Sequence, residues 1–187
     1  MSSFSTFTRW CGLLAIVGAF IFASRGLLAS PGSPKELLPL LLGMFAAIAG
    51  LHTLQRERYR LWGALSSLTS FVGVALLLAS GLLDLIAGQR LTISLLTVDL
   101  LIIGAWVAAL GLVTLGVGTI WARVLPWWCG VSIVLGSPPA VVVVWAFVGS
   151  AENPLSALGL GIAWSLVGYA IFRQARVGQT QQTSRVR

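Results

Sequence analysis

The residues that could perform chemistry in this 187-residue chain are few, and the most informative are four in succession. Gly136, Ser137, Pro138 and Pro139 interrupt the apolar segment 127–148. A proline inside a helix lacks the N–H that would bond a carbonyl four residues earlier, and its ring clashes with the preceding turn. In lipid, a carbonyl freed in this way must find a protein or water partner. The pattern predicts a buried, bent helix, and a bend within the membrane is the best indication of a cavity in this sequence.

Hydroxyl groups and one histidine are the other polar candidates within apolar segments. Ser66, Ser67 and Ser70, with Thr69, could line a polar path beside the bend, or they could join neighbouring helices. His52 could bind the metal of a haem or a chlorophyll-type pigment through one ring nitrogen. The alternative is a histidine hydrogen-bonded at the membrane surface, which is favoured because the chain has no second histidine for a two-histidine haem.

A pair of carboxylates flanks one connecting segment. Asp84 and Asp99 stand at the ends of two adjacent apolar segments, with Arg90 between them. If their faces met, the two carboxylates could share a proton or bind a cation. The simpler interpretation is that all three groups solvate an outer loop.

No recognised enzyme motif accompanies these residues. The chain contains no His/Glu metal box, no P-loop and no GxSxG sequence, so no catalytic residue, metal or cofactor is predicted. Cys11 and Cys129 lack CxxC or metal-ligand spacing, and we expect both to be free thiols.

The composition indicates that lipid surrounds the elements that position these groups. Hydrophobic residues make up 57% of the chain and charged residues 9%, and the mean hydropathy is +0.94. A soluble domain carries about 25% charged residues, so this chain cannot cover its surface with charge. The net charge of +7 resides almost wholly in loops and in the tail, which indicates membrane topology rather than nucleic-acid binding.

The hydropathy pattern predicts an all-α transmembrane bundle of six spans. The spans are predicted at about 10–28, 37–54, 61–83, 99–121, 127–148 and 155–172. The first is expected to be a retained anchor, because its leader is too weakly charged for a typical signal peptide. The link 85–98 is predicted to be a loop or a short helix on the membrane surface. Residues 173–187 form a basic tail that is expected to be mobile.

The basic residues predict the orientation. With both termini in the cytoplasm, the inner side holds nine of the 12 basic residues, namely Arg9, Arg56, Arg58, Arg60, Arg123, Arg173, Arg176, Arg185 and Arg187. The outer side then holds Arg25, Lys35 and Arg90. Lysine and arginine favour the cytoplasmic side of short loops, so a multi-pass protein of the plasma membrane is predicted. The excess of arginine over lysine points to a bacterium, and Arg173 and Arg176 are expected to face the anionic inner leaflet.

Local similarities suggest a hairpin of helices used three times. The outward-going spans begin alike, with Trp10-Cys11-Gly12, Trp62-Gly63 and Trp128-Cys129-Gly130. The alternative is that unrelated helices converge because each inner end needs tryptophans at the membrane surface.

Two motifs resemble those of a broad set of small multi-pass bacterial membrane proteins without assigned function. The first is Arg-x-Leu-Pro-x-Trp-x-Gly, at Arg123, Leu125, Pro126, Trp128 and Gly130. The second is Gly-x-Gly-x-x-Trp-x-x-x-Gly-Tyr, at Gly159, Gly161, Trp164, Gly168 and Tyr169. The resemblance covers roughly 104–176. It implies a helical integral membrane protein and no particular reaction, so it supplies no site residues.

Three functions are compatible with this pattern. The first is a non-catalytic accessory or scaffold subunit, or a small homo-oligomer, because no catalytic set or soluble domain is recognisable. The second is a transporter or channel-like protein for a small neutral or cationic solute, with its pocket at the bend. The third is a haem- or pigment-binding subunit that uses His52.

Overall fold

The computed structural model describes the backbone of residues 2–28, 37–55, 60–87, 91–123, 125–137 and 154–185. Side chains are described over the same ranges except at 2–5, 26–28, 60, 84, 87, 91–98, 154–156 and 177–185. This part of the chain forms six α-helices: α1 (Ser2–Leu28), α2 (Leu38–Gln55), α3 (Arg60–Ala87), α4 (Leu91–Ala122), α5 (Trp127–Leu135) and α7 (Pro154–Arg185).

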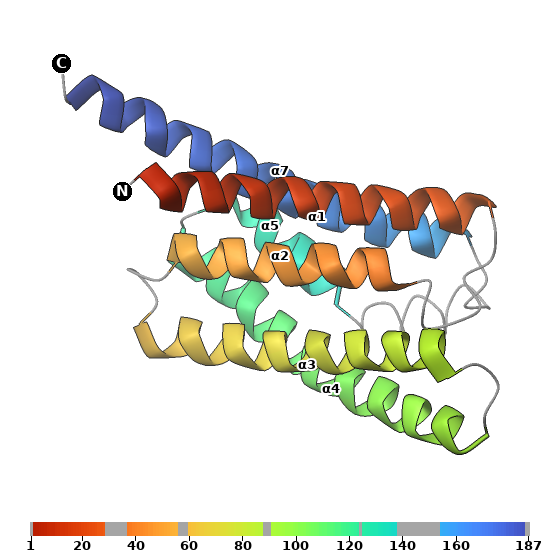
Figure 1. Cartoon of the computed structure of the whole chain (residues 1–187). Helices are drawn as coiled ribbons and strands as arrows, with labels where there is room; N and C mark the ends of the chain where they lie inside the picture. The colour runs from red at the N-terminus through yellow and green to blue at the C-terminus, as the bar shows by residue number, and fades with distance from the viewer. Residues whose placement is uncertain are drawn as a thin grey trace.

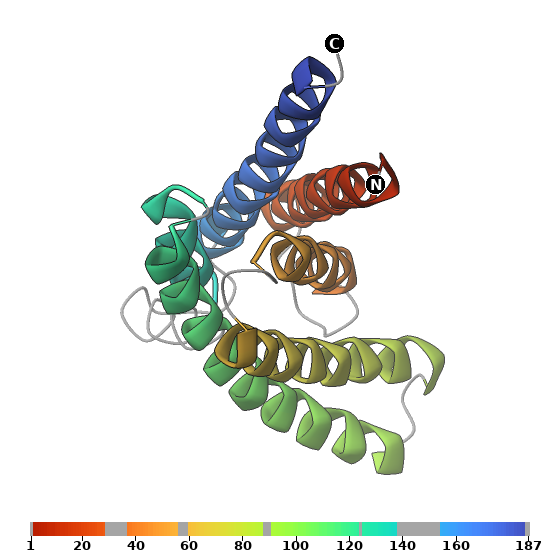
Figure 2. The same ribbon diagram turned by 90° about the vertical axis from the view of Figure 1, so that its left-hand side faces the viewer.

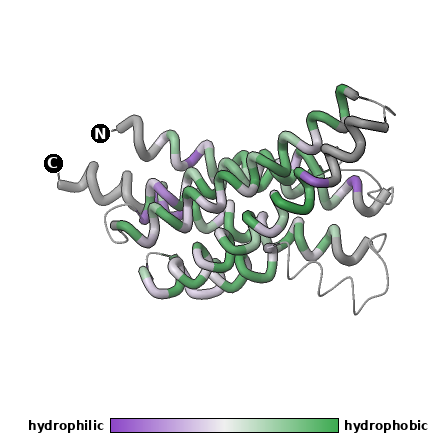
Figure 3. The backbone as a smooth tube through the Cα atoms, turned by 90° about the horizontal axis from the view of Figure 1, so that it is seen from below, coloured by the Kyte–Doolittle hydropathy of each residue, from purple (hydrophilic) through white to green (hydrophobic). Residues whose placement is uncertain are grey.

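The predicted membrane character is confirmed for four helices. Within the described ranges, four stretches are long and apolar enough to cross a membrane: Thr6–Arg25, Leu38–Gln55, Leu61–Leu83 and Asp99–Ala122. In Figure 3 the described helices are coloured as apolar over most of their length, and hydrophilic positions are few. A spanning helix needs about 20 predominantly apolar residues because the hydrocarbon core is about 30 Å thick and each helical residue rises about 1.5 Å.

The helices form two groups joined side by side. Helix α1 packs against both α2 and α7, while α3 and α4 form a long antiparallel pair (Figure 1). Helix α2 contacts α3, and the short α5 lies between α4 and α7 (Figure 2). An edge-on contact between Phe45 and Phe71, with ring centroids 4.8 Å apart, supports the α2–α3 junction. Both chain termini lie at the same end of the bundle (Figure 1).

Small residues set the distance between the helices. A Cβ atom added to Gly12 would lie 2.7 Å from the carbonyl oxygen of Gly168, and one added to Gly168 would lie 2.7 Å from that of Gly12. A Cβ atom on Gly73 would lie 2.1 Å from the backbone nitrogen of Ala108. Because lipid is as apolar as the side chains, close packing of this kind is a main source of helix association in membranes.

The predicted hairpins are visible in part. Helices α1 and α2 are antiparallel neighbours, and so are α3 and α4. The third hairpin would need residues 138–153, which lie outside the described residues. The largest contact beyond the hairpins joins α1 to α7, the first and last helices of the chain.

Several helix boundaries differ from those predicted from hydropathy. Helix α1 begins at Ser2 and α4 begins at Leu91, so most of the link 85–98 is helical. Residues 91–98 contain neither glycine nor proline, and nothing in them ends a helix. The last span is predicted to end at residue 172, but α7 continues to Arg185. Its Gln and Arg residues are good helix formers, and no proline interrupts them.

Candidate functional site

Helix α5 ends at Leu135, where the sequence predicts a bend. The Gly136 N–H donates to the carbonyl oxygen of Ser132 at 2.8 Å, which closes the last turn. The Ser137 N–H donates to the carbonyl oxygen of Val134 at 3.2 Å, and the Ser137 Oγ donates to the same oxygen. Proline at position 138 cannot donate to this carbonyl in the helical manner, so Ser137 satisfies the group that the sequence identifies as freed. Residues 138 and 139, the two prolines of the predicted hinge, lie outside the described residues.

Trp164 of α7 completes this hinge. Its indole Nε1–H donates to the carbonyl oxygen of Gly136 at 3.1 Å, across the contact between α5 and α7. Trp164 and Ser137 are each only 1% exposed. The described part of the hinge is therefore closed to solvent and internally hydrogen-bonded. The sequence signal for Trp164 was its place far from either end of an apolar segment, because a buried indole needs an acceptor.

Helix α5 is too short to cross a membrane by itself. Its nine residues span about 14 Å, which is roughly half of the ~30 Å hydrocarbon core. In membrane proteins, interrupted helices occur where the irregular backbone is buried in protein or lines a cavity. The contacts of Gly136 and Ser137 correspond to the first case.

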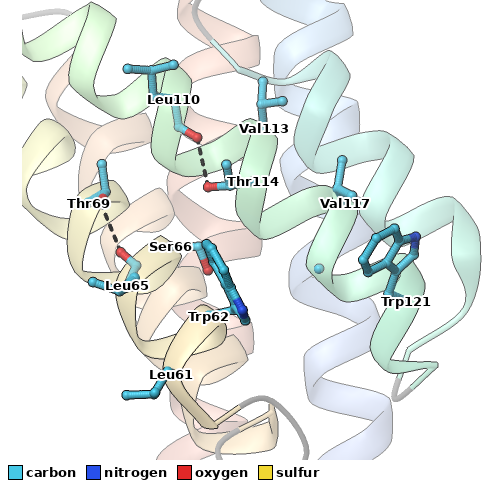
Figure 4. Close-up of a pocket in the computed structure, with 11 residues that line it drawn as sticks. Leu61, Trp62, Leu65, Ser66, Thr69, Leu110, Val113, Thr114, Val117 and Trp121 are labelled. Atoms are coloured by element: carbon cyan, nitrogen blue, oxygen red, sulfur yellow. Dashed lines mark hydrogen bonds between the residues drawn. The ribbon is translucent and has the colours of Figure 1, made fainter.

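A groove of about 720 Å³ lies between α3 and α4 (Figure 4). We call it the α3–α4 groove; it is lined by Leu61, Trp62, Leu65, Ser66, Thr69, Leu110, Val113, Thr114, Val117, Gly118 and Trp121. Both tryptophans are largely exposed. The sequence did not indicate this groove, because it depends on how far two helices diverge and no single residue marks it.

Two of the predicted hydroxyl residues of α3, Ser66 and Ser70, face α4. Ser66 lies on the wall of the α3–α4 groove, and Ser70 packs against Gly111, where an added Cβ would lie 2.4 Å from the Ser70 nitrogen. The Ser70 Oγ donates to the carbonyl oxygen of Ser66 at 2.7 Å. Ser67 is also buried. The described hydrogen bonds of Gly136 and Ser137 are to α5 and α7, and none of them involves these hydroxyl groups.

A buried polar contact joins α2 to α4, and sequence reasoning missed it. The Gln55 Nε2 donates to the Thr119 Oγ1 at 2.8 Å, and this hydroxyl donates to the carbonyl oxygen of Leu115 at 2.8 Å. Gln55 is 3% exposed and Thr119 is fully buried. A second hydroxyl contact, Thr8 to Thr53 at 3.1 Å, joins α1 to α2. Both contacts tie α2 to its neighbours near its C-terminal end.

In a double-mutant cycle of Gln55 and Thr119, we expect the two single variants to lose unequal amounts of unfolding free energy. Thr119→Val leaves the buried Gln55 amide without its acceptor and should lower the free energy of unfolding by about 1–3 kcal/mol. Gln55→Leu should have a smaller effect, because Thr119 keeps its bond to Leu115. Unfolding in mixed micelles should give a coupling of about 0.5–2 kcal/mol. Strictly additive losses would contradict the pairing, and Thr114→Val, at an exposed hydroxyl, is the matched control.

The remaining candidates are scattered. His52 is half-buried in the last turn of α2, and Asp99 is exposed. Position 90 and the Asp84 side chain lie outside the described part. Among the described residues, no group of three or more His, Cys, Asp or Glu side chains could hold a metal ion. Cys11 and Cys129 are buried free thiols, as predicted.

Arginines from α1 and α7 meet over one aromatic ring. The guanidinium carbon of Arg9 lies 5.5 Å from the ring centroid of Phe172, and that of Arg176 lies 5.0 Å from it. Each distance is within the range of a cation–π interaction. Arg173 is exposed next to this cluster. The contact places basic residues from both ends of the chain at one end of the bundle.

Comparison of the chain with protein-family models, with curated proteins and with solved structures finds no match.

Proposed function

We propose that this chain is a non-catalytic accessory or scaffold subunit of a bacterial plasma membrane, with six spans and both termini in the cytoplasm. Four spans correspond to the long apolar helices, and α5 and α7 supply the described parts of the other two. The shared end of Arg9 and Arg176 supports the orientation, because cytoplasmic loops are enriched in arginine. The resemblance to small multi-pass bacterial proteins belongs to the same proposal.

The observation that carries the proposal is the closed hinge. A transport site at the interrupted helix would need polar groups that are free to contact a solute. The described hydrogen bonds of Gly136 and Ser137 are instead made to residues of α5 and α7. Trp164 fills the space beside them and is 1% exposed. The described polar atoms of Gly136, Ser137 and Trp164 therefore stabilise the packing of α5 and α7.

The outer surface supports an interaction role. Phe20 of α1, Leu42 of α2 and Trp106 of α4 are 70%, 61% and 69% exposed. Apolar side chains of this size contact either lipid or another membrane protein. A partner subunit or a second copy of the chain can replace lipid on such a surface without exposing polar groups.

Purification of the full-length chain from its native membrane in a mild detergent tests the proposal. We expect a membrane protein to co-migrate in stoichiometric amount, or the chain to migrate as a homo-oligomer, as identified by mass spectrometry. A monomer with no stoichiometric companion would contradict the scaffold function. Reporter fusions that are active only in the cytoplasm, placed at each terminus, test the orientation separately.

The interruption of α5 supports one alternative, transport of a small neutral or cationic solute. Half-length helices near the bilayer midplane form the binding sites of many transporters, and α5 ends after nine residues. This alternative requires that replacement of Pro138 and Pro139 by alanine alters solute flux into vesicles containing the purified protein. Unchanged flux would reject it. The absorption spectrum of the same preparation tests pigment or haem binding at His52.

A further inference from the structure

The α3–α4 groove widens toward the end of the bundle where α3 begins and α4 ends. Trp62 lies two residues after the start of α3, and Trp121 lies one residue before the end of α4. Figure 4 shows these two side chains at the same end of the groove, with Thr69 and Thr114 further along it. Tryptophan is enriched where the membrane meets water. The mouth of the groove therefore lies at a membrane surface, and its length runs into the hydrocarbon core.

The described lining of the groove offers no hydroxyl donor to a polar solute. The Thr69 Oγ1 donates to the carbonyl oxygen of Leu65 at 2.9 Å, and the Thr114 Oγ1 donates to that of Leu110 at 2.8 Å. The Ser66 Oγ faces the carbonyl oxygen of Gly63 at 3.3 Å. The rest of the described wall is leucine, valine, glycine and tryptophan. A hydrocarbon chain matches this largely apolar lining.

The deep end of the groove is closed by a backbone contact. A Cβ atom on Gly111 would lie 2.4 Å from the Ser70 nitrogen, and one on Gly73 would lie 2.1 Å from the Ala108 nitrogen. The two helices thus touch just beyond Thr69 and Thr114. A transmembrane helix, about 10 Å in diameter, does not fit into a wedge that narrows to contact. The closest small-residue contacts between α3 and α4, at Gly73 and Gly111, lie beyond the deep end of the groove.

Positive charge stands at the open end. The exposed Arg123 follows the last residue of α4. Arg123 has a φ of 50°, and it is the one non-glycine residue with positive φ in the described part of the chain. Glycine is favoured at this position after a helix, and the chain uses 21 glycines elsewhere. Backbone strain of this kind is concentrated at functional sites, which points to a function for the Arg123 guanidinium.

We propose that the α3–α4 groove binds one acyl chain of an anionic phospholipid, whose phosphate contacts Arg123 at the mouth. The volume of about 720 Å³ falls within the ~300–1,000 Å³ of ordinary ligand pockets. Guanidinium groups bind phosphate oxygens through paired donors. This site is separate from the arginines of α7, and it stands whether or not a partner protein exists.

Native mass spectrometry of the full-length chain in detergent, with added phosphatidylglycerol or phosphatidylcholine of equal chain length, tests the site. The wild-type chain should retain one phosphatidylglycerol in preference to phosphatidylcholine. Thr114→Phe fills the groove from an exposed position and should reduce retention of both lipids. Ile102→Phe, on α4 outside the groove, is the matched control and should change neither.

The headgroup contact is tested by charge. Arg123→Gln should reduce the preference for phosphatidylglycerol about fivefold, while Arg25→Gln, at an exposed arginine of α1, should leave it unchanged. Arg123→Gly removes the charge and also the left-handed strain, so it should reduce the lipid preference as much as Arg123→Gln does, yet melt at a higher temperature without lipid. That combination separates lost binding from lost folding.

Three outcomes would overturn the proposal. Equal retention of the two lipids by the wild-type chain would contradict the contact between Arg123 and the phosphate. Unchanged retention in Thr114→Phe would show that the acyl chain does not bind in the groove. A dimer of the wild-type chain that Thr114→Phe disperses would assign the groove to a second copy of the protein instead.

Discussion

Replacement of Trp164 by alanine is expected to lower the free energy of unfolding by about 3–5 kcal/mol. Trp164 is the largest fully buried side chain among the described residues, and its removal leaves a cavity between α5 and α7. The same change removes the donor to the Gly136 carbonyl oxygen. That oxygen lies just past the C-terminal end of α5, where helical carbonyl groups need partners from outside the helix, and the indole is the donor described for it.

Trp164→Phe separates the two contributions. Phenylalanine keeps most of the buried volume but cannot donate a hydrogen bond, so the expected loss is smaller and includes about 1 kcal/mol for the missing bond. Unfolding by SDS in mixed micelles, followed by circular dichroism, provides the measurement. Trp106→Ala is the control, because Trp106 is 69% exposed and should change stability by less than about 0.5 kcal/mol. Equal losses at positions 164 and 106 would show that the hinge contact does not stabilise the fold.

Among glycine-to-alanine substitutions in the described chain, Gly73→Ala should lower the free energy of unfolding the most. The new Cβ would lie 2.1 Å from the backbone nitrogen of Ala108 and 2.4 Å from its Cα. No rotamer change relieves a clash with backbone, so α3 and α4 must separate along their contact. Overpacking of this kind costs about 1–3 kcal/mol or more, and the loss of close contact between the helices adds to it.

Gly159→Ala is the matched control for this prediction. Gly159 also lies within a helix, α7, and an added Cβ meets no atom within 4 Å. Alanine is the better helix former by about 1 kcal/mol, so this variant should be at least as stable as the wild-type chain. The melting temperatures of the two variants, measured in the same detergent, make the comparison. A Gly73→Ala protein as stable as Gly159→Ala would refute the tight packing of α3 on α4.

Sequence reasoning succeeded where local chemistry decides the structure. Helix α2 was predicted at 37–54 and is found at Leu38–Gln55, because a long apolar run leaves the backbone no alternative in lipid. The bend predicted at 136–139 coincides with the end of α5 at Leu135, since the prolines that follow cannot continue the hydrogen-bond ladder.

The partners of these groups could not be predicted. Trp164 lies 28 residues after Gly136, and nothing in their spacing shows that their helices touch. Gln55 and Thr119 are 64 residues apart. Each lies near the polar end of an apolar run, where a polar residue gives no sign of a buried partner. The α3–α4 groove depends on where Gly73 and Gly111 allow the helices to meet, which is a property of packing in three dimensions.

The contact between the first and last helices has a consequence for how the protein is made. Gly12 of α1 packs against Gly168 of α7, so this face of α1 is uncovered until nearly the whole chain has left the ribosome. At roughly 5–20 residues per second, the delay is about 10–30 s. During that interval α2 is the described helix that packs closely against α1, through Gly18 and Gly43. Packing of α7 against α1 is thus the step that covers this face, and a chain that stops before α7 leaves a face of small residues on α1 open to any small-residue helix nearby.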